Sequence, residues 1–198
     1  MGGTFDPIHN GHISVARAAA SCEVDKVVLV PVRHPPHKSR EDIVDPYHRY
    51  AMAALAVSGA RDLTVSPYEV AREGSSYTID TVRHFVSAGH DVALVMGSDS
   101  LAELPTWREC HELLERARAI VYPRRPLLLP QLRERLPDWI ASKWDSGWIT
   151  LLELPPIDTS SSEIRAMLRA GRSVDGLVPP AAAAYIAGQG LYAEGAPD

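Results

Sequence analysis

Strand-like apolar runs alternate with helix-like segments along most of this 198-residue chain. This order predicts a parallel sheet with helices on both faces, because each parallel strand needs a crossover before the next. We expect the strands at residues 26–31, 62–66, 91–96, 118–122 and 148–154. We expect the helices at residues 13–20, 46–58, 78–88, 107–117, 129–141, 161–170 and 180–187. The predicted fold class is α/β, with a doubly wound, mostly parallel, Rossmann-like sheet.

Length and composition favour one domain of ordinary size over residues 1–198, with a helical portion from about residue 160. Apolar residues make up 45% of the chain and charged residues 23%, which is typical of soluble globular proteins. The apolar runs are far shorter than a membrane span and no secretion signal is recognisable, so we expect a cytoplasmic protein with no membrane partner. The net charge of −5 argues against nucleic acid as a partner. The sequence leaves the oligomeric state open, including a homo-oligomer.

A glycine-rich turn at residues 2–12 carries the strongest functional signal. Its sequence is Gly-Gly-Thr-Phe-Asp-Pro-Ile-His-Asn-Gly-His. Glycines let a ligand approach backbone N–H groups, and the start of the helix that follows attracts phosphate. His9 and His12 are three residues apart, so we expect both imidazoles to face the same bound phosphates as hydrogen-bond donors. A metal-binding pair is the alternative, but no third histidine or cysteine cluster at ligand spacing supports it.

The segment from Gly2 to His12 resembles the Gly-x-Phe-x-Pro-x-His-x-Gly-His signature of the nucleotidyltransferase superfamily, and specifically that of nicotinate-mononucleotide adenylyltransferases. The resemblance implies one nucleotidyltransferase domain that binds ATP and nicotinate mononucleotide, with Mg²⁺ held mainly by the ATP phosphates. It implies catalytic roles for His9 and His12. It also implies substrate contacts for Gly2, Gly3, Thr4 and Phe5.

The start of the sequence departs from the family pattern. Only Met1 precedes the glycine-rich turn, whereas the family has an apolar strand of about six residues there. That strand normally lies at the centre of the sheet, with the phosphate-binding turn at its carboxyl end. We therefore expect the first central strand to be truncated here and the native chain to begin upstream of Met1.

Lys38 lies in the segment Pro35-Pro36-His37-Lys38, after the strand expected at residues 26–31. A solvated position on the surface is the ordinary fate of a lysine. The family resemblance instead implies that Lys38 contacts the nucleotide phosphates. Nearby basic residues add positive potential that suits a phosphorylated ligand; they are Arg33, His34, His37 and Arg40.

Tyr77 and Thr78 begin a predicted helix and resemble a segment that distinguishes pyridine-nucleotide adenylyltransferases from related enzymes. Thr78 is expected to hold the nicotinate carboxylate with its hydroxyl and with free N–H groups at the helix start. Capping the helix is its ordinary alternative role.

Gly97-Ser98-Asp99 follows the strand expected at residues 91–96, and Trp107 lies eight residues after Asp99. The resemblance implies that Gly97 and Asp99 contact the nucleotide and that Trp107 stacks on the pyridine ring. Burial in the core is the ordinary role of a tryptophan. We assign that role to Trp139, Trp144 and Trp148.

Ser160 and Glu163 have the spacing of a capping box at the start of the helix expected at residues 161–170. The resembled family uses an Ile-Ser-Ser-Thr-x-Ile-Arg segment here to hold ATP phosphates. This chain has Thr159 in place of Ile and Ser162 in place of Thr, so hydroxyl donors are kept. The resemblance implies substrate contacts for Ser160, Ser161 and Ser162, and a phosphate contact for Arg165.

These residues predict in-line attack by the 5′-phosphate of nicotinate mononucleotide on the α-phosphorus of ATP, without a protein nucleophile. Catalytic roles in stabilising charge fall to His9, His12, Lys38 and Arg165. The preference for the acid over the amide mononucleotide rests mainly on the resemblance. Three alternatives stay open: a phosphopantetheine adenylyltransferase or cytidylyltransferase, a fragment of a class I aminoacyl-tRNA synthetase, and a nonenzymatic adenine-nucleotide sensor.

Overall fold

The computed structural model describes residues 1–35, 43–124, 132–155 and 157–193. Its elements form two compact units. The motif unit contains the glycine-rich turn and comprises Gly2–Ala20, Asp25–Ser76 and Asp158–Asp198. The middle unit comprises Tyr77–Ile157, together with Met1 and Ser21–Val24. The single domain expected for residues 1–198 stays a prediction.

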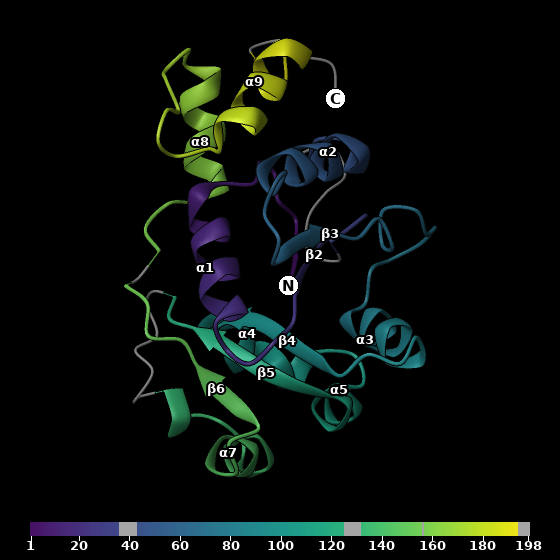
Figure 1. Ribbon diagram of the computed structural model, residues 1–198. Helices are drawn as coiled ribbons and strands as arrows, with labels where there is room; N and C mark the ends of the chain where they lie inside the picture. Colours follow the sequence, from purple (N-terminus) through teal and green to yellow (C-terminus); the bar gives the residue numbers. More distant parts are fainter. Residues whose placement is uncertain (36–42, 125–131, 156, 194–198) are drawn as a thin grey trace. The chain divides into compact units, whose positions relative to one another are not determined.

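The motif unit holds a three-stranded parallel sheet in the order β1-β2-β3 (Figure 1). The strands are β1 (Gly2–Gly3), β2 (Val27–Pro31) and β3 (Leu63–Val65). Helices α1 (Asn10–Ala20) and α2 (Pro46–Ala56) both pack on β2, four of whose five residues are buried. Burial along almost the whole strand is typical of a parallel sheet covered on both faces. The strands and helices expected in this part of the chain are confirmed.

The first strand is very short. Gly2 pairs with Val30 and Gly3 pairs with Pro31, and β1 extends no further. The glycine-rich turn therefore leaves the sheet directly after these two residues and leads into α1.

Two helices near the carboxyl end complete the motif unit, α8 (Ser161–Arg169) and α9 (Pro180–Gln189). Helix α9 packs on α2, where the hydroxyl of Tyr185 lies 2.8 Å from Nδ1 of His48. Proline suits the first position of α9 because the N–H it lacks would have no helical partner. Gly190 ends the helix with a φ of 63°, which is the left-handed conformation that glycine adopts most readily.

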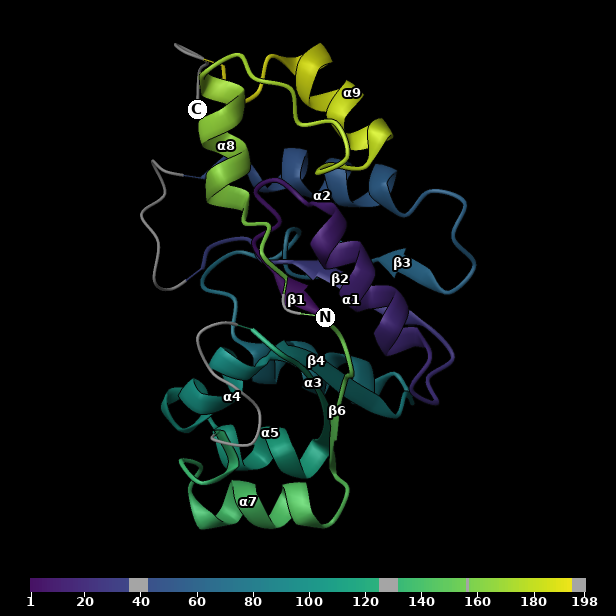
Figure 2. The same ribbon diagram turned by 90° about the vertical axis from the view of Figure 1, so that its left-hand side faces the viewer.

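The middle unit holds a second three-stranded parallel sheet, in the order β4-β5-β6 (Figure 2). The strands are β4 (Val92–Gly97), β5 (Ala117–Tyr122) and β6 (Ile149–Leu151). Four helices pack against this sheet: α3 (Thr78–Ser87), α4 (Ser98–Glu103), α5 (Cys110–Arg116) and α7 (Asp138–Asp145). Pairing runs from Val92 with Ala117 to Gly97 with Tyr122, so β4 and β5 end at the same edge.

Two helices of the middle unit differ from the sequence prediction. The helix expected at 129–141 is interrupted in its described part: residues 132–133 are helical, residues 134–136 form a turn and a bend, and helix α7 begins after Pro137. Proline has no N–H to donate and suits a position at a helix start. The helix expected at 107–117 begins at Cys110, since Glu109 has a left-handed φ of 51°. Helix α4 and the 3₁₀ turn at Leu104–Thr106 were not expected.

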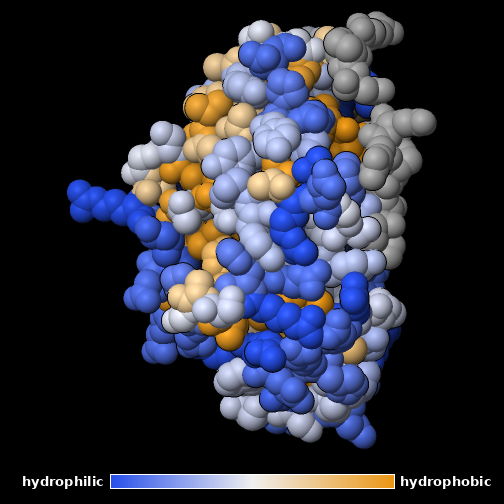
Figure 3. All heavy atoms as spheres, turned by 90° about the vertical axis from the view of Figure 1, so that its right-hand side faces the viewer, coloured by the Kyte–Doolittle hydropathy of each residue, from blue (hydrophilic) through white to orange (hydrophobic). Residues whose placement is uncertain are grey.

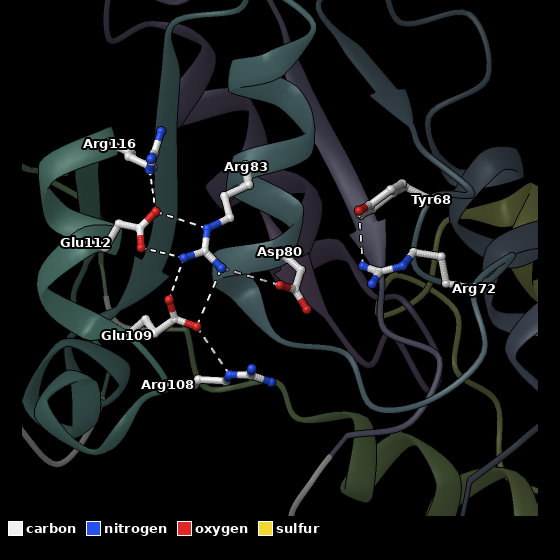
Figure 4. Close-up of polar contacts among 8 residues, drawn as sticks. All are labelled: Tyr68, Arg72, Asp80, Arg83, Arg108, Glu109, Glu112 and Arg116. Carbon is white, nitrogen blue, oxygen red and sulfur yellow. Dashed lines mark hydrogen bonds and ion pairs between the residues drawn. The ribbon is translucent and has the colours of Figure 1, made fainter.

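An ion cluster joins α3 to α5 on the surface of the middle unit (Figure 4). Arg83 of α3 donates to the carboxylates of Glu109 and Glu112, and its Nη1 lies 3.8 Å from Oδ1 of Asp80. Arg116 donates to Oε1 of Glu112 at 2.5 Å. The hydrogen bonds from Arg83, and next from Arg116, lower the pKa of Glu112 to about 2. The cluster therefore connects two helices that also share core contacts.

No helix within the described residues has the length and apolar composition needed to cross a membrane.

Figure 3 shows one face of the molecule, on which hydrophilic residues predominate in the lower part. Apolar residues appear higher on that face as a broken stripe between hydrophilic ones. Tyr47 and Leu55 of α2 are large apolar side chains that lie exposed.

Candidate active site

In the glycine-rich turn, the ring of Phe5 packs closely over one of the two glycines that precede it. Phe5 is buried and has a φ of 51°, a left-handed value that is uncommon for a residue with a side chain. Its ring folds back over Gly3, where an added Cβ would lie only 2.8 Å from two ring carbons. An added Cβ at Gly2 would meet nothing within 4 Å. The packing of the buried Phe5 ring therefore leaves no room for a side chain at position 3, whereas the space beside Gly2 is open.

His9 and His12 lie against each other at the start of α1. Their ring centroids are 3.7 Å apart and the planes differ by 28°, so the imidazoles are stacked. Nδ1 of His12 accepts a hydrogen bond from the backbone N–H of His9 at 3.2 Å. A neutral imidazole that accepts at Nδ1 carries its proton on Nε2, so His12 offers Nε2–H as a donor. The structure brings together the two histidines that were expected to face one ligand.

The start of α8 lies against the same turn. Ser160 and Glu163 form the expected capping box, in which the Ser160 hydroxyl accepts from the backbone N–H of Glu163 and donates to its carboxylate. The hydroxyl of Ser161 donates to the carbonyl of Pro7 at 3.0 Å. Ser162 accepts from Nη2 of Arg165 at 3.4 Å. Each of the three serine hydroxyls thus already has a protein contact, and their predicted contacts with substrate stay predictions.

Arg165 points from α8 toward the residue before the Pro7 bend. Its Nη1 donates to the backbone carbonyl of Asp6 at 2.7 Å and lies 3.5 Å from Oδ2 of the same residue. The other carboxylate oxygen of Asp6 accepts from the hydroxyl of Tyr192 at 2.7 Å. Asp6 is 1% exposed, so this carboxylate is buried between an arginine and a tyrosine. Burial, followed by the nearby charge of Asp6, raises the pKa of the Tyr192 hydroxyl and keeps it protonated.

Arg49 is a site residue that the sequence analysis missed. Its side chain is fully buried, and its guanidinium donates to four backbone carbonyls at 2.7–2.9 Å. These carbonyls belong to Thr4, Val32, Arg33 and Val44. Burial lowers the pKa of Arg49, while the charge of Asp6 acts in the opposite direction. Arg49 therefore ties the glycine-rich turn to the segment that follows β2.

A sequence signal for Arg49 did exist. The residue lies on the buried face of α2, three positions before Met52 and four before Ala53, both of which are fully buried. A charged residue in an otherwise apolar helical stripe requires polar partners inside the protein. Carbonyls at the carboxyl ends of the neighbouring strands are the partners that a parallel sheet supplies.

In the middle unit, Asp99 lies at the carboxyl end of β4. Its Oδ1 accepts from the backbone N–H of Ser100 at 2.9 Å, and its Oδ2 lies 3.3 Å from Nη1 of Arg124. An added Cβ at Gly97 would lie only 2.3 Å from Oδ1 of Asp99, so the Asp99 carboxylate would have to move from its present position. The hydroxyl of Ser98 bonds to the backbone of Arg124. Arg124 was not predicted, although it follows the end of β5, which coincides with the end of β4.

The residues predicted to bind the pyridine ring also lie in the middle unit. Tyr77, rather than Thr78, is the residue at the cap position of α3, and it makes no side-chain capping bond. Thr78 is the first residue of the helix. Trp107 is partly buried against the core, and the guanidinium of its neighbour Arg108 lies 4.8 Å from the centroid of the Tyr77 ring.

Three other tryptophans have the packing role expected for them. Trp139 and Trp144 pack against the core of the middle unit, and Nε1 of Trp148 donates to the carbonyls of Leu114 and Ala117. These hydrogen bonds satisfy the polar end of an otherwise apolar ring.

Lys38 lies outside the described residues, and so do His37 and Arg40 of the basic segment. Of the remaining basic residues, Arg33 donates from Nη1 to the carbonyl of Val70 at 2.8 Å. Its backbone N–H donates to the hydroxyl of Ser76 at 3.1 Å. The guanidinium of Arg33 therefore has a structural contact, and the predicted phosphate role of Lys38 stays a prediction.

The donors on the described part of the chain fit an anion better than a metal ion. Within that part, no group of three or more histidine, cysteine, aspartate or glutamate side chains lies close enough to hold a metal ion. The glycine-rich turn instead presents an imidazole N–H beside the start of α1, where the helix dipole is positive. Both features favour phosphate oxygens.

Comparison with known proteins places this arrangement in a family. The profile of the family described as cytidylyltransferase-like matches residues 1–167. A curated protein of Caldicellulosiruptor bescii, named probable nicotinate-nucleotide adenylyltransferase, is 37% identical over 193 residues, which cover 97% of this chain and 96% of that protein. A protein of the same name from Neisseria meningitidis serogroup B is 40% identical over 195 residues, with the same coverage. The chain belongs to the nicotinate-nucleotide adenylyltransferase family.

Membership in the nicotinate-nucleotide adenylyltransferase family confirms the resemblance found in the segment from Gly2 to His12. A solved structure of Plasmodium falciparum nicotinic acid mononucleotide adenylyltransferase complexed with NaAD is similar to this chain, with a TM-score of 0.73 at 19% identity. The similarity covers 96% of this chain and 94% of that one. At this identity the similarity shows the fold, and it confirms the expected Rossmann-like α/β class. The roles of individual residues stay predictions.

Proposed function

We propose that this protein transfers the adenylyl group of ATP to nicotinate mononucleotide. The products are nicotinate adenine dinucleotide and pyrophosphate, so the reaction is a step in NAD biosynthesis. The observation that carries this proposal is the relationship, over nearly the full length, to proteins named for this reaction. The anion-binding character of the glycine-rich turn supports it, since ATP presents a polyphosphate.

The motif unit supplies the proposed grip on the ATP phosphates. His12 would donate through Nε2, because its Nδ1 already accepts from the backbone of His9. The positive end of the α1 dipole adds attraction for the same anion. Arg165 and Lys38 complete the proposed set as charged donors. Substrate contacts of Gly2, Gly3, Thr4 and Phe5 would come from the backbone of the turn.

The chemistry proposed for these residues needs no protein nucleophile. The attacking phosphate monoester has a second pKa of about 6, so it is already anionic at neutral pH. Alignment of two bound reactants contributes roughly 7–11 kcal/mol to lowering the barrier. One preorganised donor to the developing charge contributes roughly 2.7–4 kcal/mol. The side chains therefore act by holding phosphates and by stabilising charge as the bond to pyrophosphate breaks.

Mg²⁺ would reach the site with ATP and be held mainly by the phosphate oxygens. The N–H donors proposed in the turn bind phosphate oxygens, so the phosphates rather than the side chains of the turn would hold the ion. When bound, the ion neutralises charge on the phosphates. The residues of the chain then only have to orient the resulting complex.

Thr78 and Trp107 are the residues we propose for the pyridine nucleotide, and Gly97 and Asp99 for further nucleotide contacts. The start of α3 favours a carboxylate, which supports nicotinate over nicotinamide as the bound ring. We keep the cytoplasmic location predicted from the sequence. A homo-oligomer is compatible with the proposal and is not required by it.

One assay tests the function and its alternatives. Purified protein with Mg-ATP and nicotinate mononucleotide is expected to release pyrophosphate and form the dinucleotide, detected by chromatography. Nicotinamide mononucleotide at equal concentration is expected to react more slowly. Release of pyrophosphate only with phosphopantetheine, or only with CTP and a suitable acceptor, would indicate one of the related transferases. Binding of ATP without turnover of any acceptor would indicate a nucleotide sensor.

A further inference from the structure

Tyr192 stands out because its backbone is strained while its side chain makes one specific contact. The residue has a φ of 64°, in the left-handed region that favours glycine. Such a conformation costs on the order of 1–3 kcal/mol in a residue that carries a side chain. Yet Tyr192 is 6% exposed, and its hydroxyl donates to Oδ1 of Asp6 at 2.7 Å. A tyrosine whose backbone adopts a conformation that favours glycine indicates that its hydroxyl has a function.

The group that receives this hydrogen bond is itself connected to a proposed phosphate contact. Asp6 holds Arg165 twice, through its backbone carbonyl at 2.7 Å and through its carboxylate at 3.5 Å. The side chain of Arg165 is only 17% exposed. Tyr192, Asp6 and Arg165 therefore form a continuous polar chain that ends at a guanidinium beside the glycine-rich turn.

Two guanidiniums interact with the buried Asp6 carboxylate. Arg165 lies 3.5 Å from it, and the charge of Asp6 also acts on the fully buried Arg49. A guanidinium held in a partly buried position is a strong charge-assisted donor to a phosphate. Holding Arg165 in place before the anion arrives also reduces the entropy lost on binding, since a free arginine side chain has about 2 kcal/mol of rotamer entropy.

We propose that Tyr192 is a positioning residue for ATP: its hydroxyl orients the Asp6 carboxylate, which holds the Arg165 guanidinium toward the polyphosphate. The inference rests on the proposed function, because it assumes that Arg165 contacts ATP. It adds a role for the carboxyl-terminal segment and for the aspartate of the glycine-rich turn.

The test is Tyr192→Phe, which removes the hydroxyl and keeps the ring. The KM for ATP is expected to rise roughly tenfold, consistent with the loss of one hydrogen bond to a charged group. The KM for nicotinate mononucleotide is expected to stay at the parent value. The matched control is Tyr185→Phe, which removes a hydroxyl that lies 2.8 Å from His48 in the same unit and is expected to leave both KM values unchanged.

A double variant separates positioning from a general loss of structure. If Tyr192 acts through Arg165, then Tyr192→Phe has no further effect on the KM for ATP in an Arg165→Met background. An equal tenfold effect in both backgrounds would overturn the inference. Asp6→Asn gives a second approach if Tyr192→Phe does not fold, because it keeps the carbonyl contact to Arg165 and is also expected to raise the KM for ATP.

The outcomes distinguish this inference from the proposed function. An active parent protein with an unaltered KM for ATP in folded Tyr192→Phe, or in folded Asp6→Asn, overturns the inference alone. A parent protein that releases no pyrophosphate from ATP and nicotinate mononucleotide overturns the proposed function and the inference together.

Discussion

At the scale of single residues, polar side chains inside the motif unit have the clearest energetic consequences. Arg49 donates to four backbone carbonyls from a fully buried position. Its removal would leave acceptors without donors in a region from which water is excluded. Each such acceptor costs about 1–3 kcal/mol.

We therefore predict that Arg49→Met lowers the free energy of unfolding by at least about 2 kcal/mol, because several buried carbonyls lose their donor. Denaturation in urea, followed by circular dichroism, measures this change. Arg61→Met is the control, since Arg61 is exposed in the same unit and its loss is expected to change stability by less than about 0.5 kcal/mol. Equal stability of the two variants would contradict the role given to Arg49.

His12→Ala is predicted to act on the chemical step. The variant loses the Nε2–H donor to the phosphates, so kcat is expected to fall by about 10²–10³ while the KM for nicotinate mononucleotide changes little. Steady-state kinetics on both substrates provides the measurement. His90→Ala, at an exposed histidine after α3, is expected to retain the parent kcat. A parent-like kcat in His12→Ala would remove His12 from the proposed mechanism.

The sequence predicted the residues of the glycine-rich turn better than it predicted their partners. The motif predicted that His9 and His12 lie together, because their contact depends on three residues of spacing at a helix start. Asp6 and Tyr192 interact over a separation of 186 residues, and no local pattern identifies such a pair. Arg49 left a signal in the apolar stripe of α2, whereas Arg124 became recognisable only when the coinciding ends of β4 and β5 were known.

At the scale of elements, the alternation of apolar runs predicted most strands and helices, because burial in a parallel sheet leaves a continuous apolar signal. The errors lie where short segments are decided by single residues. Pro137 ends a turn and allows α7 to begin, and the left-handed Glu109 delays the start of α5. The ion cluster that joins α3 to α5 could not be predicted, since it depends on which charged side chains the tertiary structure brings together on the surface.

That link predicts a dependence of stability on pH. The pKa of Glu112 is lowered from 4.5 to about 2 by its hydrogen bonds with Arg83 and Arg116. A lowered pKa means that the contribution of the carboxylate to stability is complete above about pH 4.5 and is lost as the pH falls toward 2. The stability difference between the parent and Glu112→Gln is therefore expected at pH 7 and is expected to shrink between pH 4.5 and pH 2.

Urea midpoints at a series of pH values measure this difference. Glu115→Gln is the matched control, because Glu115 is exposed on the same helix and is not part of the cluster in Figure 4. Its effect on the midpoint is expected to be small at every pH. A Glu112→Gln midpoint equal to that of the parent at pH 7 would show that the cluster contributes nothing measurable, as is often found for exposed ion pairs.

At the scale of the whole molecule, residues proposed for the two substrates fall in different parts of the chain. The described donors proposed for the ATP phosphates lie in the motif unit, and the residues proposed for the pyridine ring lie in the middle unit. Lys38 lies outside the described residues. Both groups were predicted from the family resemblance together with the expected fold, in which most of these residues follow a strand or lie near a helix start. The family relationship then supplied the substrates, which no physical pattern in the sequence distinguishes.

Trp107→Ala is predicted to raise the KM for nicotinate mononucleotide roughly tenfold, since stacking of a base on an aromatic ring contributes about 1–3 kcal/mol. The KM for ATP is expected to change by much less. Trp107→Phe keeps an aromatic face and is expected to restore most of the affinity. Equal changes in both KM values, with a lower melting temperature, would instead indicate that Trp107 acts only in the core.

The hydrogen bond that joins Asp6 to Tyr192 also constrains when a newly made molecule becomes competent. The two residues are 186 positions apart, so the aspartate leaves the ribosome long before its tyrosine has been synthesised. At roughly 5–20 residues per second the delay is about 10–40 s. Throughout that interval the nascent chain has the glycine-rich turn but lacks the tyrosine that orients its aspartate.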